Sequence, residues 1–391
     1  VAFLVWLVVP QTIAIASLYP LVLFMAVSNT GEATEGSLSI KVENQKSGLV
    51  VSVIKQKVDF QSGENLVNLT CSMGDSIEMW NEFNPVLYKV DLEVNAGSVK
   101  TERSTKFGMR EFSRNQSDLL LNGNKVFLRG TLECCIFPLT GRPPMEPEGW
   151  KKVFLTAREW GVNHLRFHSW CPPEAAFQAA DELGMYYMIE CSSWANQSTT
   201  IGDGKPIDEF IRQEAERIVN AYGNHPSFCM MAYGNEPAGK HSNDYLTRFV
   251  SDWKECDSRR LYTSAAGWPN LPVNDFLSDA TPRIQQWGAG LKSIINSKAP
   301  STTYDWRSYT QKFKQPFISH EIGQWCVYPN FREMEKYTGV YKARNFEIFQ
   351  ESLKKNGLIQ LADSFLLASG KLQTLCYKAD IEAALRTPDF G

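Results

Sequence analysis

Hydrophobic and polar positions alternate along the first hundred residues of the chain, with turn-forming residues between the alternating runs. The period of two runs through residues 38–44 and 87–94, and less regularly through 49–54. Clusters rich in Asn, Gly and Ser, such as 29–31, separate these runs. Short strands at this spacing predict a small antiparallel β-sandwich in this part of the chain.

The pattern changes near Leu121, where short apolar runs begin to alternate with segments of helical periodicity. We predict strands at 124–130, 163–168, 186–191, 228–233, 261–266, 284–287 and 317–320, and helices at 148–160, 173–183, 207–222, 244–255 and within 343–386. This repeat predicts an α/β TIM barrel of the (β/α)8 type. Seven strands are assigned and the chain ends at Gly391, so we expect the barrel to lack its eighth strand.

Residues 1–31 contain no charged side chain, which leaves two interpretations open. One is a membrane anchor or signal segment, and the other is a set of short buried strands. Pro10 and Pro20 interrupt the run and no basic residues precede it, so we favour strands and expect no membrane partner.

Charge and cysteine content exclude several classes of function. The net charge is −3 and no basic run is present, so we expect no nucleic-acid partner. The nine cysteines lack zinc-like pairs, so we expect no metal site, and the two-carboxylate chemistry described next requires no cofactor. Eleven Trp, 14 Tyr and 22 Phe indicate large cores, with sugar stacking as the functional alternative.

Two apolar predicted strands end abruptly in a carboxylate. Asn235 and Glu236 follow the strand at 228–233, and His320 and Glu321 follow the strand at 317–320. Reactive side chains of a (β/α)8 barrel lie at these strand ends, and two facing carboxylates are the minimum set for glycoside hydrolysis. Each motif alone is explained better by a solvated Glu in a turn or loop; together they favour catalysis. We expect burial to raise the pKa of Glu236, as suits an acid.

A series of segments resembles glycoside hydrolase family 2, the group of β-galactosidases, β-glucuronidases and β-mannosidases. The matching segments, in chain order, are Met-Trp-Asn-Glu-Phe-Asn-Pro-Val-Leu-Tyr at 79–88, Phe-Gly-Met-Arg-Glu-Phe at 107–112, Leu-Asn-Gly-Asn-Lys-Val-Phe-Leu-Arg-Gly at 121–130, Asn-His-Leu-Arg-Phe-His at 163–168, Ala-Asp-Glu-Leu-Gly at 180–184 and Asn-Glu at 235–236. The resemblance implies a remnant of an N-terminal sugar-binding sandwich at 1–10, an immunoglobulin-like sandwich at 11–113 and a catalytic barrel at 114–391.

The resemblance also implies roles for individual residues. Glu236 is expected as general acid/base and Glu321 as nucleophile of a retaining exo-β-glycosidase acting on a terminal β-linked sugar. Asn235 is expected to bond to a sugar 2-hydroxyl and His168 to contact a sugar hydroxyl. Trp287 is expected to stack on the sugar ring, and Trp325 to form one wall of the sugar site. Arg166 and His320 are expected to give structural support, and Glu190 is expected either to contact the substrate or to pair with a nearby base.

One departure bears on the substrate. Many family members read Arg-x-Ser-His-Tyr-Pro after the second barrel strand, whereas residues 166–172 here read Arg-Phe-His-Ser-Trp-Cys-Pro. We expect β-galactosides first, with β-glucuronides and β-mannosides as alternatives. A non-catalytic carbohydrate-binding protein or an inactive truncated form on the same scaffold is the competing interpretation. Oligomeric state is left open, and a periplasmic or extracellular location is the working expectation.

Overall fold

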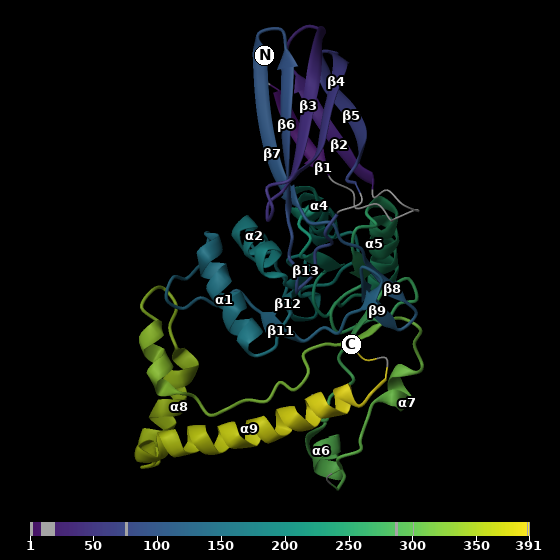
Figure 1. The fold of residues 1–391 in the computed structure, drawn as a ribbon. Coiled ribbons are helices and arrows are strands. Elements are labelled where there is room, and N and C mark those ends of the chain that lie inside the picture. The colour runs from purple at the N-terminus through teal and green to yellow at the C-terminus, as the bar shows by residue number, and fades with distance from the viewer. Residues whose placement is uncertain are drawn as a thin grey trace.

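The chain forms an all-β domain joined to a larger α/β domain (Figure 1). The computed structural model describes residues 3–8, 20–74, 77–285, 288–299, 301–388 and 390. The strands of the first domain are β1 (Phe3–Val8), β2 (Pro20–Asn29), β3 (Thr34–Asn44), β4 (Val50–Phe60), β5 (Gly63–Ser72), β6 (Tyr88–Ala96) and β7 (Val99–Phe107). They form a four-stranded sheet in the order β4-β3-β6-β7 and a three-stranded sheet in the order β1-β2-β5.

The predicted alternation places side chains of both sheets in one core. Every second residue of β6 is buried, from Tyr88 to Ala96, and alternate residues of β2 face the same core. The strand interpretation of the uncharged N-terminal segment is confirmed for β1 and β2, which pair antiparallel; residues 1, 2 and 9–19 lie outside the described residues. That residues 1–10 are the remnant of a preceding domain stays a prediction.

The second domain begins with a small antiparallel sheet and continues as a βα repeat. Its strands are β8 (Phe112–Asn115), β9 (Asp118–Leu121), β10 (Asn124–Lys125), β11 (Gly130–Glu133), β12 (His164–Phe167), β13 (Tyr186–Glu190), β14 (Phe228–Ala232), β15 (Leu261–Thr263), β16 (Leu277–Asp279) and β17 (Phe317–Ser319). Its helices are α1 (Pro147–Glu159), α2 (Glu174–Leu183), α3 (Ala195–Ser198), α4 (Pro206–Tyr222), α5 (Ser242–Cys256), α6 (Ile294–Ser297), α7 (Arg307–Thr310), α8 (Arg344–Lys355) and α9 (Ala362–Leu385).

The parallel strands follow the chain order of a barrel. Strands β11 to β15 form one sheet in sequence order, and β16 pairs with β17. A parallel bridge between Gly267 and Asp279 connects the two groups. Phe390 makes a parallel bridge to Phe317 of β17, at the place where an eighth strand would add. No sheet closes the barrel within the described residues, and the absence of the eighth strand stays a prediction.

Two predicted barrel strands were wrong. The first strand is Gly130–Glu133, because residues 124–125 pair with β9 instead. The sixth strand is Leu277–Asp279, whereas Ile284 packs against Trp306 and Ala383 in a separate cluster. A buried strand of three residues is too short to show any periodicity, so the apolar pair at 284 and 287 was the stronger signal.

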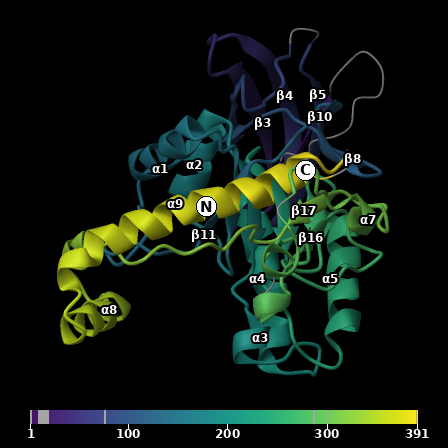
Figure 2. The same cartoon turned by 90° about the horizontal axis from the view of Figure 1, so that it is seen from below.

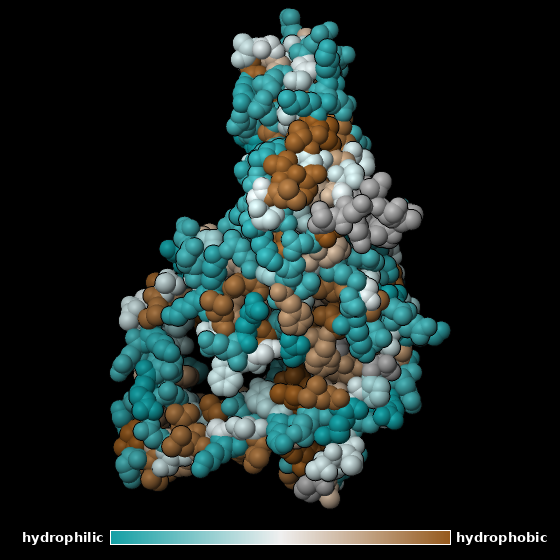
Figure 3. Space-filling model, in the orientation of Figure 1, coloured by the Kyte–Doolittle hydropathy of each residue, from teal (hydrophilic) through white to brown (hydrophobic). Residues whose placement is uncertain are grey.

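Helix α9 lies on the side of the barrel away from the sandwich in both ribbon views (Figures 1 and 2). Together with α8 it forms an arm whose outer surface is partly apolar (Figure 3). Exposed apolar side chains on this arm include Ile348, Phe349, Phe365, Leu367, Leu372 and Leu375. In the part of the chain that the structure describes, no helix combines the length and apolar character needed to cross a bilayer.

Arg110, in the segment between β7 and β8, connects the end of the sandwich to the start of β14 by hydrogen bonds. Its guanidinium is buried and donates to the carbonyls of Pro226 at 2.9 Å and Phe228 at 2.8 Å, and also to the carbonyl of Arg259. The guanidinium thus supplies hydrogen-bond donors to backbone carbonyls from three positions in the chain. The contact fixes the end of the barrel opposite the candidate site.

His225, in the turn before β14, is held by two carboxylates. Its Nδ1 lies 2.6 Å from Asp181 Oδ2 and its Nε2 lies 3.3 Å from Glu174 Oε1. Burial lowers the pKa of His225, but the charges and hydrogen bonds of Asp181 and Glu174 outweigh it and raise the pKa from 6.5 to about 9. Protonated His225 therefore stabilises the fold.

This stabilisation is expected to depend on pH. Because the folded pKa is raised, the contribution is complete below pH 6.5 and is lost as the pH rises through about 9. We expect the free energy of unfolding in urea to fall by about 2–3 kcal/mol between pH 7 and pH 10. His225→Gln should remove most of this dependence, and His241→Gln, at an exposed histidine, should retain it. An equal pH slope in wild type and His225→Gln would contradict the assignment.

Candidate active site

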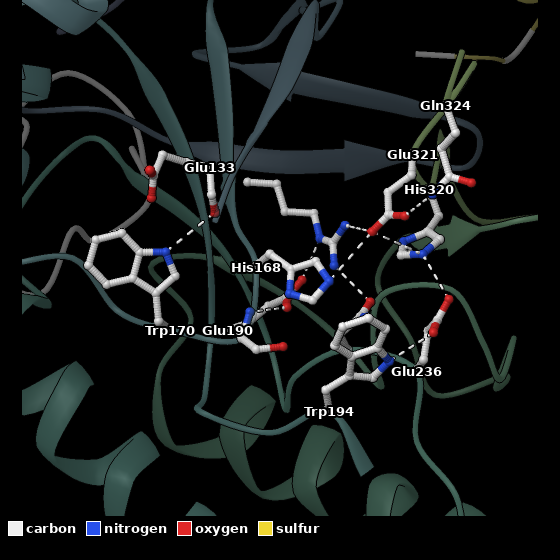
Figure 4. A network of polar contacts seen from close by, with 12 residues as sticks. Glu133, His168, Trp170, Glu190, Trp194, Glu236, His320, Glu321 and Gln324 are labelled. Carbon is white, nitrogen blue, oxygen red and sulfur yellow. Dashed lines mark hydrogen bonds and ion pairs between the residues drawn. The ribbon is translucent and has the colours of Figure 1, made fainter. Parts of the chain in front are cut away.

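Glu236 and Glu321 lie at the carboxyl ends of β14 and β17, as the sequence predicted (Figure 4). Bridges from Asn235 to Trp194 and to Ala266 extend the sheet up to Glu236, whose backbone N–H donates to Ala266 at 2.9 Å. The neighbouring strands therefore hold the backbone that carries Glu236.

Both glutamates have backbone angles that side-chain-bearing residues rarely adopt. The φ angle is +36° at Glu236 and +53° at Glu321. Each non-glycine residue in this region costs of order 1–3 kcal/mol and persists only where the surroundings hold it. Strained backbone conformations of this kind occur more often at functional sites, and here both follow the end of a barrel strand.

The imidazole of His320 lies between the two carboxylates. Its Nε2 is 3.5 Å from Glu236 Oε1 and 3.5 Å from Glu321 Oε1, and the ring is fully buried. The two oxygens are therefore separated by no more than twice that distance. A Cβ at Gly267 would lie 3.1 Å from Glu236 Cγ and 3.3 Å from His320 Nε2, so this part of the site is closely packed.

Arg166, on β12, connects three of the predicted site residues. Its Nε donates to Glu190 at 2.5 Å, its Nη1 to Glu321 at 2.9 Å and its Nη2 to Asn235 at 2.8 Å. A guanidinium fork suits this task because its donors are fixed in one plane. Arg166 thus supports Glu321 directly, and supports Glu236 through Asn235, the residue before it.

Glu190 has both carboxylate oxygens occupied. One accepts from Arg166, the other accepts from the backbone N–H of Ser169 at 2.7 Å, and the side chain is fully buried. Of the two predicted roles, this geometry favours structural pairing over substrate contact. His168 lies nearer the reacting groups, with Nε2 3.7 Å from Glu321 Oε1.

Asn235 presents a donor with no partner. Its Oδ1 accepts from Arg166, whereas its Nδ2 is buried and lacks a hydrogen bond within the described residues. Buried polar groups are nearly always paired, so an orphaned donor at a strand end indicates a ligand group or a water.

The expectation of a raised pKa at Glu236 was wrong for this structure. The neighbouring imidazole of His320, 3.5 Å away, lowers the pKa of Glu236, burial raises it, and a hydrogen bond from Trp194 Nε1 at 2.8 Å lowers it further. His320 and Trp194 together outweigh burial. For Glu321, burial raises the pKa, but His320 and Arg166 together outweigh burial and the net shift is downward. Glu321 is therefore an ionised carboxylate at neutral pH.

The aromatic candidates are placed unequally. Trp325 directs its indole N–H to Asp380 at 2.7 Å and packs with Ile284 and Trp306, and its role as a sugar wall stays a prediction. Trp287 lies outside the described residues.

Among the described residues, no group of three or more His, Cys, Asp or Glu has an arrangement that could hold a metal ion.

Comparison with known proteins assigns the chain to a family. Residues 113–356 match the profile described as glycosyl hydrolases family 2, TIM barrel domain, and residues 22–110 match that of glycosyl hydrolases family 2. The chain belongs to glycoside hydrolase family 2.

Curated and solved relatives agree with this family. The β-galactosidase large subunit of Latilactobacillus sakei is 23% identical over 253 residues, covering 61% of this chain and 40% of that protein. The β-galactosidase of Thermoanaerobacterium thermosulfurigenes is 24% identical over 270 residues, covering 66% and 37%. The crystal structure of Bacteroides uniformis β-glucuronidase shares the fold with a TM-score of 0.65 at 18% identity, covering 84% of this chain and 40% of that one. The chain spans less than half the length of these relatives.

Three residues of the candidate site were missed from the sequence. Trp194 donates to Glu236, Gln324 donates to Glu321 at 2.5 Å, and Arg283 donates to Gln324 at 2.7 Å. Trp194 follows the third barrel strand and Gln324 follows Glu321 closely, so their positions after strands were the available signal. Arg283 was hidden because the sixth strand was placed after it.

Proposed function

We propose that this chain is the catalytic part of a retaining exo-β-glycosidase that removes single β-linked sugars from non-reducing ends. The observation that carries the proposal is the pair of strand-end carboxylates facing one buried imidazole, with Glu321 also bound by Arg166. Two carboxylates held about 5–5.5 Å apart perform this reaction with retention. The limit that His320 sets on their separation is compatible with that spacing.

In the first step, Glu321 attacks the anomeric carbon and forms a glycosyl ester as the bond to the leaving oxygen breaks. Glu236 gives its proton to that oxygen. In the second step, Glu236 accepts a proton from water, the water oxygen bonds to the anomeric carbon, and the ester to Glu321 breaks. Arg166 and His320 favour the ionised form of Glu321 that the first step needs.

Glu236 must be protonated to act as the acid, although its hydrogen bonds in this structure favour the ionised form. A sugar in the site would shield Glu236 from water, and a leaving oxygen next to it would replace the indole N–H of Trp194. Both changes raise the pKa of a carboxyl group. We propose that substrate binding prepares Glu236 for the first step in this way.

The sugar would be oriented by groups around the carboxylates. Asn235 Nδ2, buried and unpaired among the described residues, is suited to bind the 2-hydroxyl. His168, beside Glu321, is suited to a neighbouring hydroxyl. Bonds to the 2-hydroxyl that strengthen in the transition state contribute several kcal/mol in glycosidases.

β-Galactosides are the first substrate to test, since curated relatives carry the name β-galactosidase. β-Glucuronides and β-mannosides follow. A panel of aryl β- and α-glycosides decides between them. Release from α-linked substrates alone would refute the proposal, and binding without turnover would favour a non-catalytic carbohydrate-binding protein.

The stereochemistry of the product provides a separate prediction. Two successive displacements invert the anomeric carbon twice, so the first-formed sugar should be the β-anomer. Proton NMR of the early product, before mutarotation, measures this directly. An initial α-anomer would mean single displacement, which needs carboxyl groups about 6.5–9.5 Å apart.

A further inference from the structure

Asp380, on the last helix, joins two loops that reach the candidate nucleophile. Its side chain is fully buried. Its Oδ1 accepts from the backbone N–H of Ile284 at 2.8 Å, and its Oδ2 accepts from Trp325 Nε1 at 2.7 Å. Ile284 directly follows Arg283 in the chain, and Trp325 directly follows Gln324. One carboxylate therefore ties together the backbone next to two residues of the site.

Those two residues continue the connection to Glu321. Arg283 Nη1 donates to Gln324 Oε1 at 2.7 Å, and Gln324 Nε2 donates to Glu321 Oε2 at 2.5 Å. Arg283 also donates from Nε and Nη2 to the carbonyl of His320, at 3.2 and 2.7 Å. The residue before Glu321 and the carboxylate of Glu321 are thus both held through Arg283. Figure 4 shows Gln324 beside Glu321 and His320.

The turn that carries the nucleophile needs such support. Gln324, like Glu321, has a positive φ, at +40°. Gly323 between them has a φ of +93°, and a Cβ there would collide with the ring of Tyr377. Tyr377 and Asp380 are three residues apart on α9, so one face of the helix meets this turn at two points. Conformations of this kind persist only when their surroundings determine them.

We propose that Asp380 is a positioning residue for the nucleophile, fixing the Glu321 carboxylate through the paired loops of Arg283 and Gln324. The inference rests on the proposed function, since it takes Glu321 as the nucleophile. In-line attack requires the carboxylate oxygen to be held close to the anomeric carbon, and a misplacement of about 1 Å can cost on the order of 10²-fold in rate. Asp380 touches neither Glu321 nor Glu236, so its effect passes through the turn.

The test measures nucleophile attack in the full chain. In Asp380→Asn the remaining side-chain oxygen can still accept one of the two N–H groups, from Ile284 or from Trp325. The new NH2 group is itself a donor and cannot accept the other N–H, so one of the two loops is no longer held. With 2,4-dinitrophenyl 2-deoxy-2-fluoro-β-galactoside, which traps the nucleophile, we expect the inactivation rate constant to fall about ten- to a hundredfold. The KM for 2,4-dinitrophenyl β-galactoside should change less than about twofold, because the change acts on the transition state.

Trp325→Phe removes the indole N–H that donates to Asp380 and should slow trapping to a similar extent. The double variant Asp380→Asn with Trp325→Phe should be little slower than either single variant. Glu382→Gln, an acid on the same helix that pairs with Lys378 and Arg386, is the matched control and should trap like wild type. If Asp380→Asn lowers the melting temperature, Trp325→Phe decides the outcome.

The possible failures are distinguishable. Wild-type trapping rates in both Asp380→Asn and Trp325→Phe would overturn this inference alone, since the wild type would still react. Additive losses in the double variant would also overturn it, because the two residues would then act independently. A wild-type chain unreactive toward the galactoside probe and the matching mannoside and glucuronide would overturn the proposed function, and this inference with it.

Discussion

Glu321→Gln is expected to abolish turnover of every glycoside that the wild type cleaves. The amide is nearly isosteric, so it keeps the shape of the site, but it is a far weaker nucleophile than the ionised carboxylate that Arg166 and His320 maintain. The loss should be roughly a thousandfold or more in kcat, with no covalent intermediate detectable by intact-protein mass spectrometry after reaction with a 2-deoxy-2-fluoro glycoside.

Glu133→Gln is the matched control for this experiment. Glu133 also ends a barrel strand, and its carboxylate accepts from the backbone N–H of Cys135. The same amide substitution there should leave the covalent intermediate detectable. A labelled peptide that contains a carboxylate other than Glu321 would show that the nucleophile is misassigned.

Glu236→Ala is expected to separate substrates by their leaving group. Without the acid, a poor leaving group departs unprotonated, and general acid catalysis contributes typically 10²–10⁴-fold. The rate for an alkyl or disaccharide substrate should fall by about that factor, whereas formation of the glycosyl-enzyme from a 2,4-dinitrophenyl glycoside should be nearly unchanged. Hydrolysis of the intermediate should slow, because Glu236 also activates the water.

Trp194→Phe also tests the role of Glu236 as the acid, by changing the residue that donates a hydrogen bond to it. It removes the indole N–H that Glu236 accepts while keeping an aromatic ring. Loss of a donor to the ionised form raises the pKa of a carboxyl group, so the alkaline limb of kcat/KM should move to higher pH. Equal damage by Glu236→Ala on good and poor leaving groups would contradict the role of Glu236 as the acid.

Local sequence patterns predicted the elements well where the elements are long. Period-two alternation identified β3 and β6, and helical periodicity identified α1, α4 and α5 close to their observed bounds. The short strands β11 and β16 were misplaced. Both lie near a competing apolar run, at 124–128 and at 284–287, and a strand of three or four residues is too short to outweigh such a run.

The sequence by itself determined the sandwich-and-barrel organisation, the family and the two strand-end glutamates, because each of these rests on local periodicity or on a motif read in order. It did not determine what surrounds them. Trp194 beside Glu236, Gln324 and Arg283 beside Glu321, and the net downward pKa shift of Glu236 follow from tertiary contacts. The longest of these in sequence joins Glu236 to His320, 84 positions later. Electrostatics and positioning depend on distances across the barrel, and only the tertiary structure decides them.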